Sequence, residues 1–387
     1  MKNNIKILVI SLFFTGTVFA QNGQALIKKS INEQQSNLVE EFRAFLSIPN
    51  VAINPKGLQD NANWIKNYMQ SKGIEEVSLL TLPNSQMPPV VYGEVKVPGA
   101  TETVIFYAHY DGQPVDSSKW FPGLHPFKPA LYSGSYENGA TVLPWLSAGN
   151  NYDVNARIYA RGASDDKAGV MAIINAYAQL KALNIRPTVN IKFFFEGEEE
   201  AGSPNLEAFL ELYKNKLASN IWVICDGPVH QSGKKQLVMG VRGDTHLELT
   251  VFGPKRPLHS GHYGNWVLNP AMELVRLLAS MKNEKGEVTI KGFYDDVIAL
   301  STAEKQALAN IPSVEDQLKK ELGINATERT GALNDALQLP SLNINGIQSA
   351  GVGKYSANVI PTKAIASVDM RLVVGNDWQR QQQKVID

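Results

Sequence analysis

Four glutamates follow an apolar run in the sequence FFFEGEEEAGS, residues 193–203. They are Glu196, Glu198, Glu199 and Glu200, and a Gly-Ser-Pro sequence follows at 202–204. Bringing several carboxylates to the end of a buried strand is electrostatically costly unless a positive charge lies beside them. A metal ion would supply that charge. The pattern therefore predicts a metal site, and other strand ends should deliver compatible ligands.

Three further residues with suitable side chains stand at the ends of expected elements. His109 follows an apolar strand expected over 103–108, Asp226 follows one expected over 221–225, and Asp165 stands at the entrance of a helix. Continuous apolar runs are typical of strands in a covered parallel sheet, whose carboxyl ends share one crevice. Mixed imidazole and carboxylate ligands suit zinc or another borderline divalent ion better than calcium or magnesium.

Each of these residues, taken alone, has an ordinary structural explanation. A histidine after a strand is commonly a satisfied structural group, and an aspartate at a helix start is commonly a cap. A glutamate run is commonly a solvated surface, and an Asp-Gly-Pro sequence a turn. The agreement of four strand or helix ends favours a metal site over these explanations.

The elements that must position these residues alternate between helix and strand. Apolar spacing predicts helices over 38–46 and from Trp64 to Gly73, a helix that ends near Leu183, and another over 206–217. Strands are expected over 77–82, 90–97, 103–108, 158–160, 189–195 and 221–225. This order predicts an α/β domain with a mostly parallel sheet flanked by helices.

The pattern changes near Arg242 and indicates a second domain. Residues 245–252 alternate apolar and polar side chains, which is typical of a sheet with one wet face. A helix is expected after Asn269 and Pro270. Capping patterns predict short helices within 286–339, strands are expected over 342–347 and 364–374, and a last helix begins at Asn376 and Asp377.

Composition excludes several classes of function. Lys and Arg together balance Asp and Glu at 37 each, so no global field favours nucleic acid or an anionic membrane. Cys225 is the only cysteine, which excludes an internal disulfide, and its apolar strand indicates a buried structural thiol. We find no Gly-x-Ser-x-Gly elbow, no P-loop and no Gly-x-Gly-x-x-Gly after a strand.

The first twenty residues have the pattern of a secretory signal peptide. Lys2 and Lys6 precede an apolar segment over 7–14, and Val-Phe-Ala at 18–20 precedes Gln21 as a cleavage pattern. The apolar segment is shorter than the roughly 20 residues that span a membrane, which disfavours an anchor. The expected location is secreted or periplasmic, with no membrane span after cleavage.

Four motifs in one order carry a family resemblance. They are His109-x-Asp111, Gly162-x-x-Asp165-Asp166-Lys167, Glu199-Glu200-Ala201-Gly202-Ser203, and Asp226. From about Phe42 onward the chain closely resembles the M20 family of dinuclear zinc peptidases, in particular its carnosinase-like dipeptidases. After the signal peptide expected at 1–20, the resemblance implies a zinc-peptidase-like catalytic domain at 21–241, and an inserted α+β ferredoxin-like lid and dimerisation domain at 242–387.

The resemblance also implies roles for single residues. His109 and Asp226 would bind one zinc ion, Asp165 would bridge two ions, and Glu200 would bind the second, with manganese or cobalt as alternative metals. Glu199 would be the general base, and Asp111 would orient His109. The peptide bond between Asp165 and Asp166 would be cis, and Glu196 and Glu198 are left as supporting or solvated groups.

Three residues of the lid domain would act on the substrate. His259, in LHSGHYG, would reach a partner subunit's active site to stabilise the oxyanion, while Asn358 and Arg371 would bind the substrate carboxylate. If the resemblance is set aside, a turn motif would explain the histidines, and an exposed charge on a strand would explain Arg371. The implied assembly is a homodimer formed through the lid domain.

The expected function is hydrolysis of short peptides, most specifically dipeptides, at a dizinc centre. An N-acyl-amino-acid deacylase is the alternative enzyme, and Asp rather than Glu at 226 resembles the peptidase branch. The family pattern places its last zinc ligand, a histidine, in a later segment, and no histidine follows His262. We therefore expect an incomplete form of a longer enzyme, which leaves a non-catalytic binding protein as a third hypothesis. Residues 113–157 are interpreted as an extra loop near the rim of the site.

Overall fold

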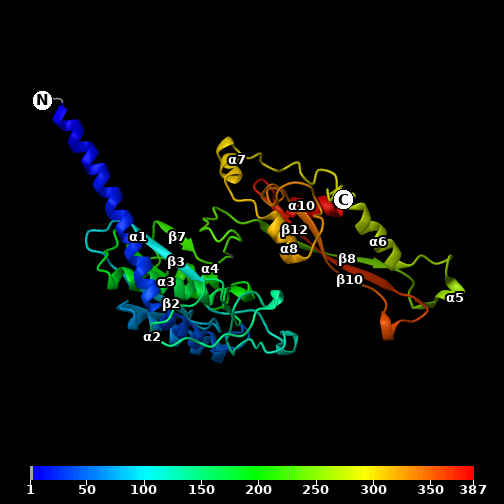
Figure 1. Ribbon diagram of the computed structural model, residues 1–387. Coiled ribbons are helices and arrows are strands. Elements are labelled where there is room, and N and C mark those ends of the chain that lie inside the picture. Colours follow the sequence, from blue (N-terminus) through cyan, green and yellow to red (C-terminus); the bar gives the residue numbers. More distant parts are fainter. Residues whose placement is uncertain (1–2, 228) are drawn as a thin grey trace. The chain divides into compact units, whose positions relative to one another are not determined.

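The computed structural model describes residues 3–227 and 229–387, with side chains described from residue 23 onward. The signal peptide expected over 1–20 lies outside the described side chains, and the backbone of residues 3–20 belongs to helix α1 (Asn3–Leu46). Within the described part of the chain, no helix combines the length and the apolar character that crossing a membrane requires. The chain forms two compact units, Met1–Pro228 and Val229–Asp387 (Figure 1). The expected domain boundary at 241–242 falls just before the first regular strand of the second unit.

A mixed five-stranded sheet forms the centre of the first unit. Its order is β1-β2-β6-β3-β7, with β1–β2 and β2–β6 antiparallel and β6–β3 and β3–β7 parallel. The α/β class is thus confirmed, with antiparallel strands at one edge. The strands are β1 (Glu76–Leu80), β2 (Val90–Val95), β3 (Thr103–His109), β6 (Asn190–Glu196) and β7 (Ile221–Ile224).

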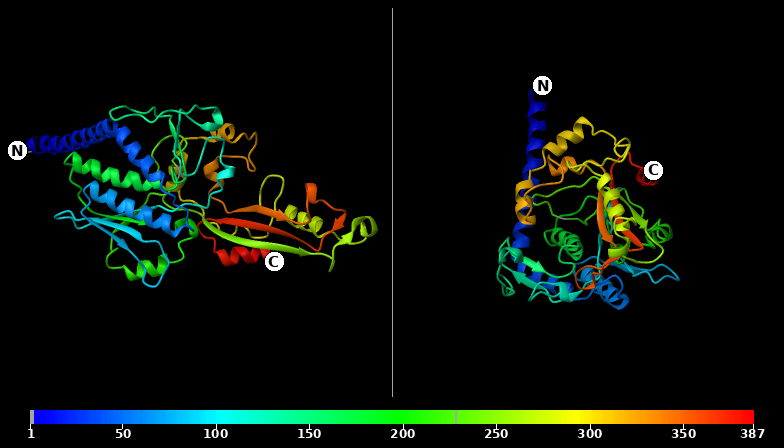
Figure 2. Two further views of the ribbon diagram at one scale, coloured as in Figure 1. Left: turned by 90° about the horizontal axis from the view of Figure 1, so that it is seen from below. Right: turned by 90° about the vertical axis from the view of Figure 1, so that its right-hand side faces the viewer.

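Helices cover both faces of this sheet because β6 is apolar on both. Phe193 and Phe195 point to one face, where the end of α1 packs with α2 (Pro55–Ser71) and α3 (Lys167–Ala182). Phe194 points to the other face and packs against Phe209 of α4 (Leu206–Leu212). Figures 1 and 2 show these helices in the blue and green part of the chain.

The parallel register brings the functional strand ends together. His109 at the end of β3 pairs with Glu196 at the end of β6, and Tyr107 pairs with Ile224 at the end of β7. The residues that follow β6 and β7 therefore emerge at the edge where His109 lies. The peptide bond between Asp165 and Asp166, just before α3, is cis, as the resemblance implied.

The extra loop at 113–157 docks on α1. The antiparallel strands β4 (Ala130–Tyr132) and β5 (Arg157–Tyr159) pair, and Gly149 N donates to Ser36 Oγ at 3.1 Å. Tyr152 N donates to Gln35 Oε1 at 2.7 Å. The rings of Phe121, Tyr132, Tyr136 and Tyr159 contact one another. The loop is thus a packed substructure with its own aromatic cluster.

The second unit contains a three-stranded antiparallel sheet in the order β10-β12-β8. Its apolar face, which includes Ala364, Val368 and Met370, packs against α6 (Pro270–Ser280) and α10 (Trp378–Ile386). Figure 2 shows these helices beside the sheet. The strands are β8 (Gly243–Phe252), β10 (Ser341–Gln348) and β12 (Lys363–Leu372), and β9 (Leu258–His259) pairs with β11 (Val359–Ile360).

The remaining helices of the chain are short. The predicted capping box at Ser301 is present, because Ser301 and Glu304 exchange backbone-to-side-chain hydrogen bonds at the start of α7. The short helices are α5 (Ser260–Tyr263), α7 (Thr302–Ala309), α8 (Glu315–Leu322) and α9 (Leu333–Ala336). Short 3-10 helices lie at Ser117–Lys119, Tyr136–Asn138, Glu199–Ala201 and Gly353–Tyr355.

Candidate metal centre and active site

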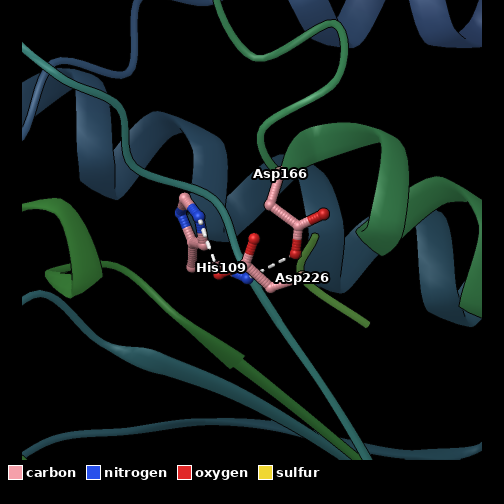
Figure 3. Close-up of side chains that lie close together, drawn as sticks. All are labelled: His109, Asp166 and Asp226. Atoms are coloured by element: carbon pink, nitrogen blue, oxygen red, sulfur yellow. Dashed lines mark hydrogen bonds and ion pairs between the residues drawn. The ribbon is translucent and has the colours of Figure 1, made fainter. Parts of the chain in front are cut away.

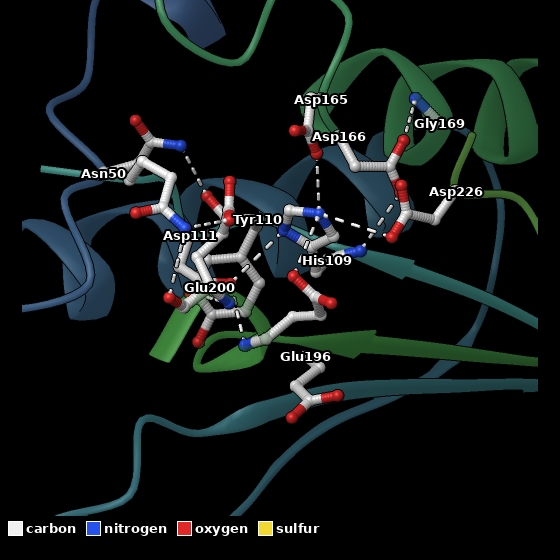
Figure 4. Close-up of polar contacts among 12 residues, drawn as sticks. Asn50, His109, Tyr110, Asp111, Asp165, Asp166, Gly169, Glu196, Glu200 and Asp226 are labelled. Carbon is white, nitrogen blue, oxygen red and sulfur yellow. Dashed lines mark hydrogen bonds and ion pairs between the residues drawn. The ribbon is translucent and has the colours of Figure 1, made fainter. Parts of the chain in front are cut away.

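His109 is the centre of a cluster of carboxylates. Its side chain is 1 % exposed, and its Nε2 lies 2.9 Å from Asp165 Oδ1 and 3.6 Å from Asp226 Oδ2. Glu199 Oε2 lies 3.8 Å from the same nitrogen. Figure 4 shows the carboxylates of Asp165 and Asp226 beside the imidazole ring. Strand β3, the loop before α3 and the segment after β7 thus deliver their side chains to one point.

Asp111 connects His109 to the glutamate turn. Its fully buried carboxylate lies 3.3 Å from His109 Nδ1, an ion-pair distance rather than a well-formed hydrogen bond. Its two oxygens accept the backbone N–H groups of Glu199 at 3.2 Å and Glu200 at 3.0 Å. One carboxylate therefore orients the ring and fixes the turn that carries the candidate base.

Asp165 and Asp166 play different parts although they are neighbours. Asp166 is 2 % exposed, and its oxygens accept His109 N at 3.2 Å and Gly169 N at 3.1 Å. Figure 3 shows it with His109 and Asp226. Asp165 has a side chain 60 % exposed and a carboxylate directed at His109. The cap of α3 is thus Asp166, which corrects the structural explanation of Asp165 as the cap.

Only one of the two carboxylate oxygens of Glu200 accepts a hydrogen bond from another described residue. Gln113 Nε2 donates to Glu200 Oε2 at 2.7 Å, while Glu200 Oε1 is buried without a hydrogen-bond partner. A buried carboxylate oxygen without a donor is costly unless a cation binds it. Glu196 Oε1 is also buried without a hydrogen-bond partner, but Glu200 is the glutamate whose ligand atom groups with those of His109 and Asp165, so Glu200 fits a metal ligand.

Burial and the charges of neighbouring side chains shift the pKa values of the residues in this site. Burial lowers the pKa of His109, but the carboxylates, Asp111 first, outweigh it and raise that pKa to about 10. Burial raises the pKa of Asp166 to about 7. Burial also raises the pKa of Glu199 and of Asp226, with the imidazole of His109 opposing both shifts. So many carboxylates around one imidazole create a field that favours a cation.

The donor set fits a divalent metal. Two groups of three residues bring their ligand atoms within 4.8 Å of one another. The first group is His109, Asp165 and Glu200, and the second is His109, Asp166 and Asp226. One imidazole with several carboxylates suits a borderline divalent ion. Because both oxygens of Asp166 already accept backbone N–H groups, Asp165 is the freer ligand of the two.

The other two glutamates of the run are buried supports. Glu198 is 6 % exposed and accepts Asn205 N and Nδ2 at 3.0 and 3.1 Å, which fixes the chain before α4. Glu196 is fully buried and accepts Tyr107 Oη at 2.7 Å. The supporting alternative thus holds for both, and the solvated one does not. Cys225 is half-buried, and burial raises the pKa of its thiol.

The remaining predicted site residues lie in the second unit. His259 is exposed, its Nδ1 accepts Gly261 N at 3.0 Å, and its ring lies 4.8 Å from that of His262. The pairing of β9 with β11 brings Asn358 beside it, since Ser260 N donates to Asn358 O at 3.0 Å. The side chain of Arg371 is 46 % exposed and lies 3.4 Å from Asp369 and 3.7 Å from Asp244. Their action at the metal centre stays a prediction.

Comparisons with known proteins agree with this geometry. A model of peptidase family M20/M25/M40 matches residues 105–337. The chain is 30% identical over 292 residues to the Cys-Gly metallodipeptidase of Schizosaccharomyces pombe and 31% identical over 301 residues to the human Beta-Ala-His dipeptidase. These matches cover 74% and 76% of this chain but 57% and 55% of the two relatives, so the chain spans little more than half of their length.

Solved structures show the same fold. An M20 family metallo-carboxypeptidase from Sulfolobus solfataricus superposes with a TM-score of 0.69 at 30% identity, covering 90% of this chain and 74% of that one. Human carnosine dipeptidase 1 superposes with a TM-score of 0.70 at 24% identity, covering 94% and 75%. The family match spans more than half of the chain and includes the strand ends that gather around His109. The chain belongs to the M20/M25/M40 peptidase family.

Proposed function

We propose that the protein hydrolyses the peptide bond of short peptides, most specifically dipeptides, at a centre of two divalent metal ions. The observation that carries the proposal is the position of Glu199, whose carboxylate lies 3.8 Å from His109 Nε2, beside the candidate metal ligands. The dipeptidases among the relatives support a dipeptide substrate.

The residues divide into ligands and proton carriers. His109 and Asp226 would hold one ion, Asp165 would bridge, and Glu200 would hold the second, with zinc as the first choice and manganese or cobalt as alternatives. When bound, such ions polarise a carbonyl group and lower the pKa of water. Glu199 would take a proton from the attacking water and later give it to the leaving amine. Asp111 would hold both the ring of His109 and the backbone of Glu199 in place.

The second unit is proposed as the lid and dimerisation domain. His259 would stabilise the oxyanion in a partner subunit, and Asn358 and Arg371 would bind the substrate carboxylate. A panel of dipeptides and N-acetyl amino acids with the metal-loaded protein tests the substrate class. Preferential cleavage of dipeptides such as Cys-Gly is expected; preferential cleavage of N-acetyl amino acids would favour the deacylase, and turnover of neither would contradict an enzymatic role.

An exposed apolar surface supports the proposed homodimer. Trp266, Leu268, Met272 and Val275 are 80%, 71%, 53% and 51% exposed and lie on α6 or directly before it. We expect Trp266→Glu to shift a dimer to a monomer, because it places a charge in that surface. Trp378→Glu, which changes another exposed tryptophan, should leave the mass unchanged. Light scattering measures both, and a monomeric wild-type protein would contradict the proposal.

Export remains part of the proposal. Cleavage after Ala20 would leave Gln21 as the first residue of the mature protein in a secreted or periplasmic location. N-terminal sequencing of the protein from its native compartment is expected to begin at Gln21. A protein that retains Met1 would contradict export by cleavage.

A further inference from the structure

The linker over residues 47–54, between α1 and α2, contacts the strand end that carries His109. Asn50 Nδ2 donates to Tyr110 O at 2.9 Å, and Ala52 N donates to Gly112 O at 2.9 Å. These two bonds lie on either side of Asp111, as Figure 4 shows for Asn50. Asn50 is fully buried, so the bond to Tyr110 is shielded from competing water. The linker therefore holds the backbone on which Asp111 and His109 stand.

The same linker is held from its other side by Lys167. This residue follows the Asp165–Asp166 pair, is 0% exposed, and donates from Nζ to Phe45 O at 2.9 Å and to Ile48 O at 2.8 Å. Its ammonium group also lies 4.4 Å from the centre of the Phe45 ring. Among the described residues, no carboxylate forms an ion pair with Lys167. Its partners are thus the backbone at the end of α1 and an aromatic face.

A buried lysine at the start of α3 is unfavourable unless its hydrogen bonds offset the cost of burying its charge. A buried cation loses its hydration, and the start of a helix repels positive charge. The last carbonyl groups of α1 need donors, however, and a long side chain with several N–H groups can reach one of them, Phe45 O, together with Ile48 O just beyond the helix. An apolar side chain would leave both carbonyls without this donor.

We propose that Lys167 and Asn50 are positioning residues that fix the separation between the loop carrying Asp165 and the strand end carrying His109 and Asp111. Asn50 lies in the 47–54 linker, and Lys167 binds that linker and the end of α1 before it, so the linker connects the position of one set of ligands to that of the other. The proposal rests on the proposed metal centre, but not on the reaction assigned to it. It predicts that loosening the linker weakens metal binding beyond any loss of stability.

The first test compares two buried lysines. Lys192 is 7 % exposed and also donates from Nζ to two backbone carbonyls, Lys216 O and Ala218 O, but it lies on β6 away from the metal ligands. Lys167→Met and Lys192→Met should both lower the melting temperature. Zinc affinity, measured by competition with a chromophoric chelator, should fall at least about tenfold in Lys167→Met and less than about twofold in Lys192→Met. Equal affinities in wild type and Lys167→Met, or equal losses in both variants, would overturn the proposal.

A second variant keeps the proposal testable if Lys167→Met does not fold. Asn50→Ala removes the bond to Tyr110 O, and Asn190→Ala is its control at the opposite end of the sheet, where Asn190 Oδ1 accepts Val97 N. The cobalt-loaded Asn50→Ala protein should show weaker binding and a changed visible absorption spectrum, while the control should match wild type. An unchanged affinity and spectrum in Asn50→Ala would contradict the proposal. Neither test uses hydrolysis, so a failure of the proposed reaction would be seen separately.

Discussion

Replacing Glu199 with glutamine is expected to slow dipeptide hydrolysis by about 10²–10⁴-fold while leaving metal binding intact. The amide keeps the size of the side chain but can no longer accept a proton from water. Its neighbours stay in place, since Asp111 holds the turn through the backbone N–H groups of Glu199 and Glu200. Steady-state kinetics and metal content, measured on the same preparation, check both halves of the prediction.

The matched control changes an exposed glutamate nearby. Glu211 lies on α4, its side chain is 75% exposed, and its partner is the surface residue Lys214. Glu211→Gln should leave both turnover and metal content unchanged. A Glu199→Gln protein with wild-type turnover would rule out Glu199 as the base. A variant that lost its metal would instead place Glu199 among the ligands.

Replacing His109 with alanine is expected to weaken zinc binding by more than about 100-fold. His109 belongs to both groups of candidate ligands, and its removal leaves carboxylates that repel one another. Because loss of a residue that only supports a ligand typically costs about 10–100-fold in affinity, loss of the shared ligand itself should cost more. Titration of the metal-free proteins with zinc measures the change.

The size of the loss in zinc affinity should distinguish metal ligands from residues that only hold a ligand in place. Asp111→Asn should weaken zinc binding by about 10–100-fold, less than His109→Ala, because Asp111 acts through the ring and the turn. His230→Ala, outside both groups, should bind zinc as wild type does. Circular dichroism of each metal-free variant checks that it is folded. Wild-type affinity in His109→Ala would contradict the assignment of the metal centre.

The main elements of the first unit could be predicted from local sequence. The run of three phenylalanines requires a strand covered on both faces, and β6 has that environment. Similar apolar runs predicted where β3 and β7 end. The parallel pairing of these strands with each other and of β3 with β6 brings His109 and Asp226 to one edge of the sheet. Composition and spacing were sufficient here because strand ends in such a sheet converge by geometry.

The supporting contacts could not be predicted in this way. Asn50 and Lys167 act through hydrogen bonds to backbone groups 60, 122 and 119 residues away, and backbone carbonyls carry no sequence signal. Gln113 meets Glu200 across 87 residues and has no distinguishing pattern. The cap made by Asp166 did have a local signal, its position before α3, but the adjacent Asp165 obscured it. The antiparallel β1 and β2 edge also depends on long-range pairing.

The proposed hydrolysis depends on metal held around His109. The most direct measurement is dipeptide hydrolysis by the wild-type protein before chelation, after chelation, and during stepwise return of zinc. Activity is expected to disappear with the metal and to return in proportion to the zinc bound, and His109→Ala is expected not to recover at the same zinc concentrations. Hydrolysis that persists in the metal-free protein, or zinc bound in full without any hydrolysis, would contradict the proposal.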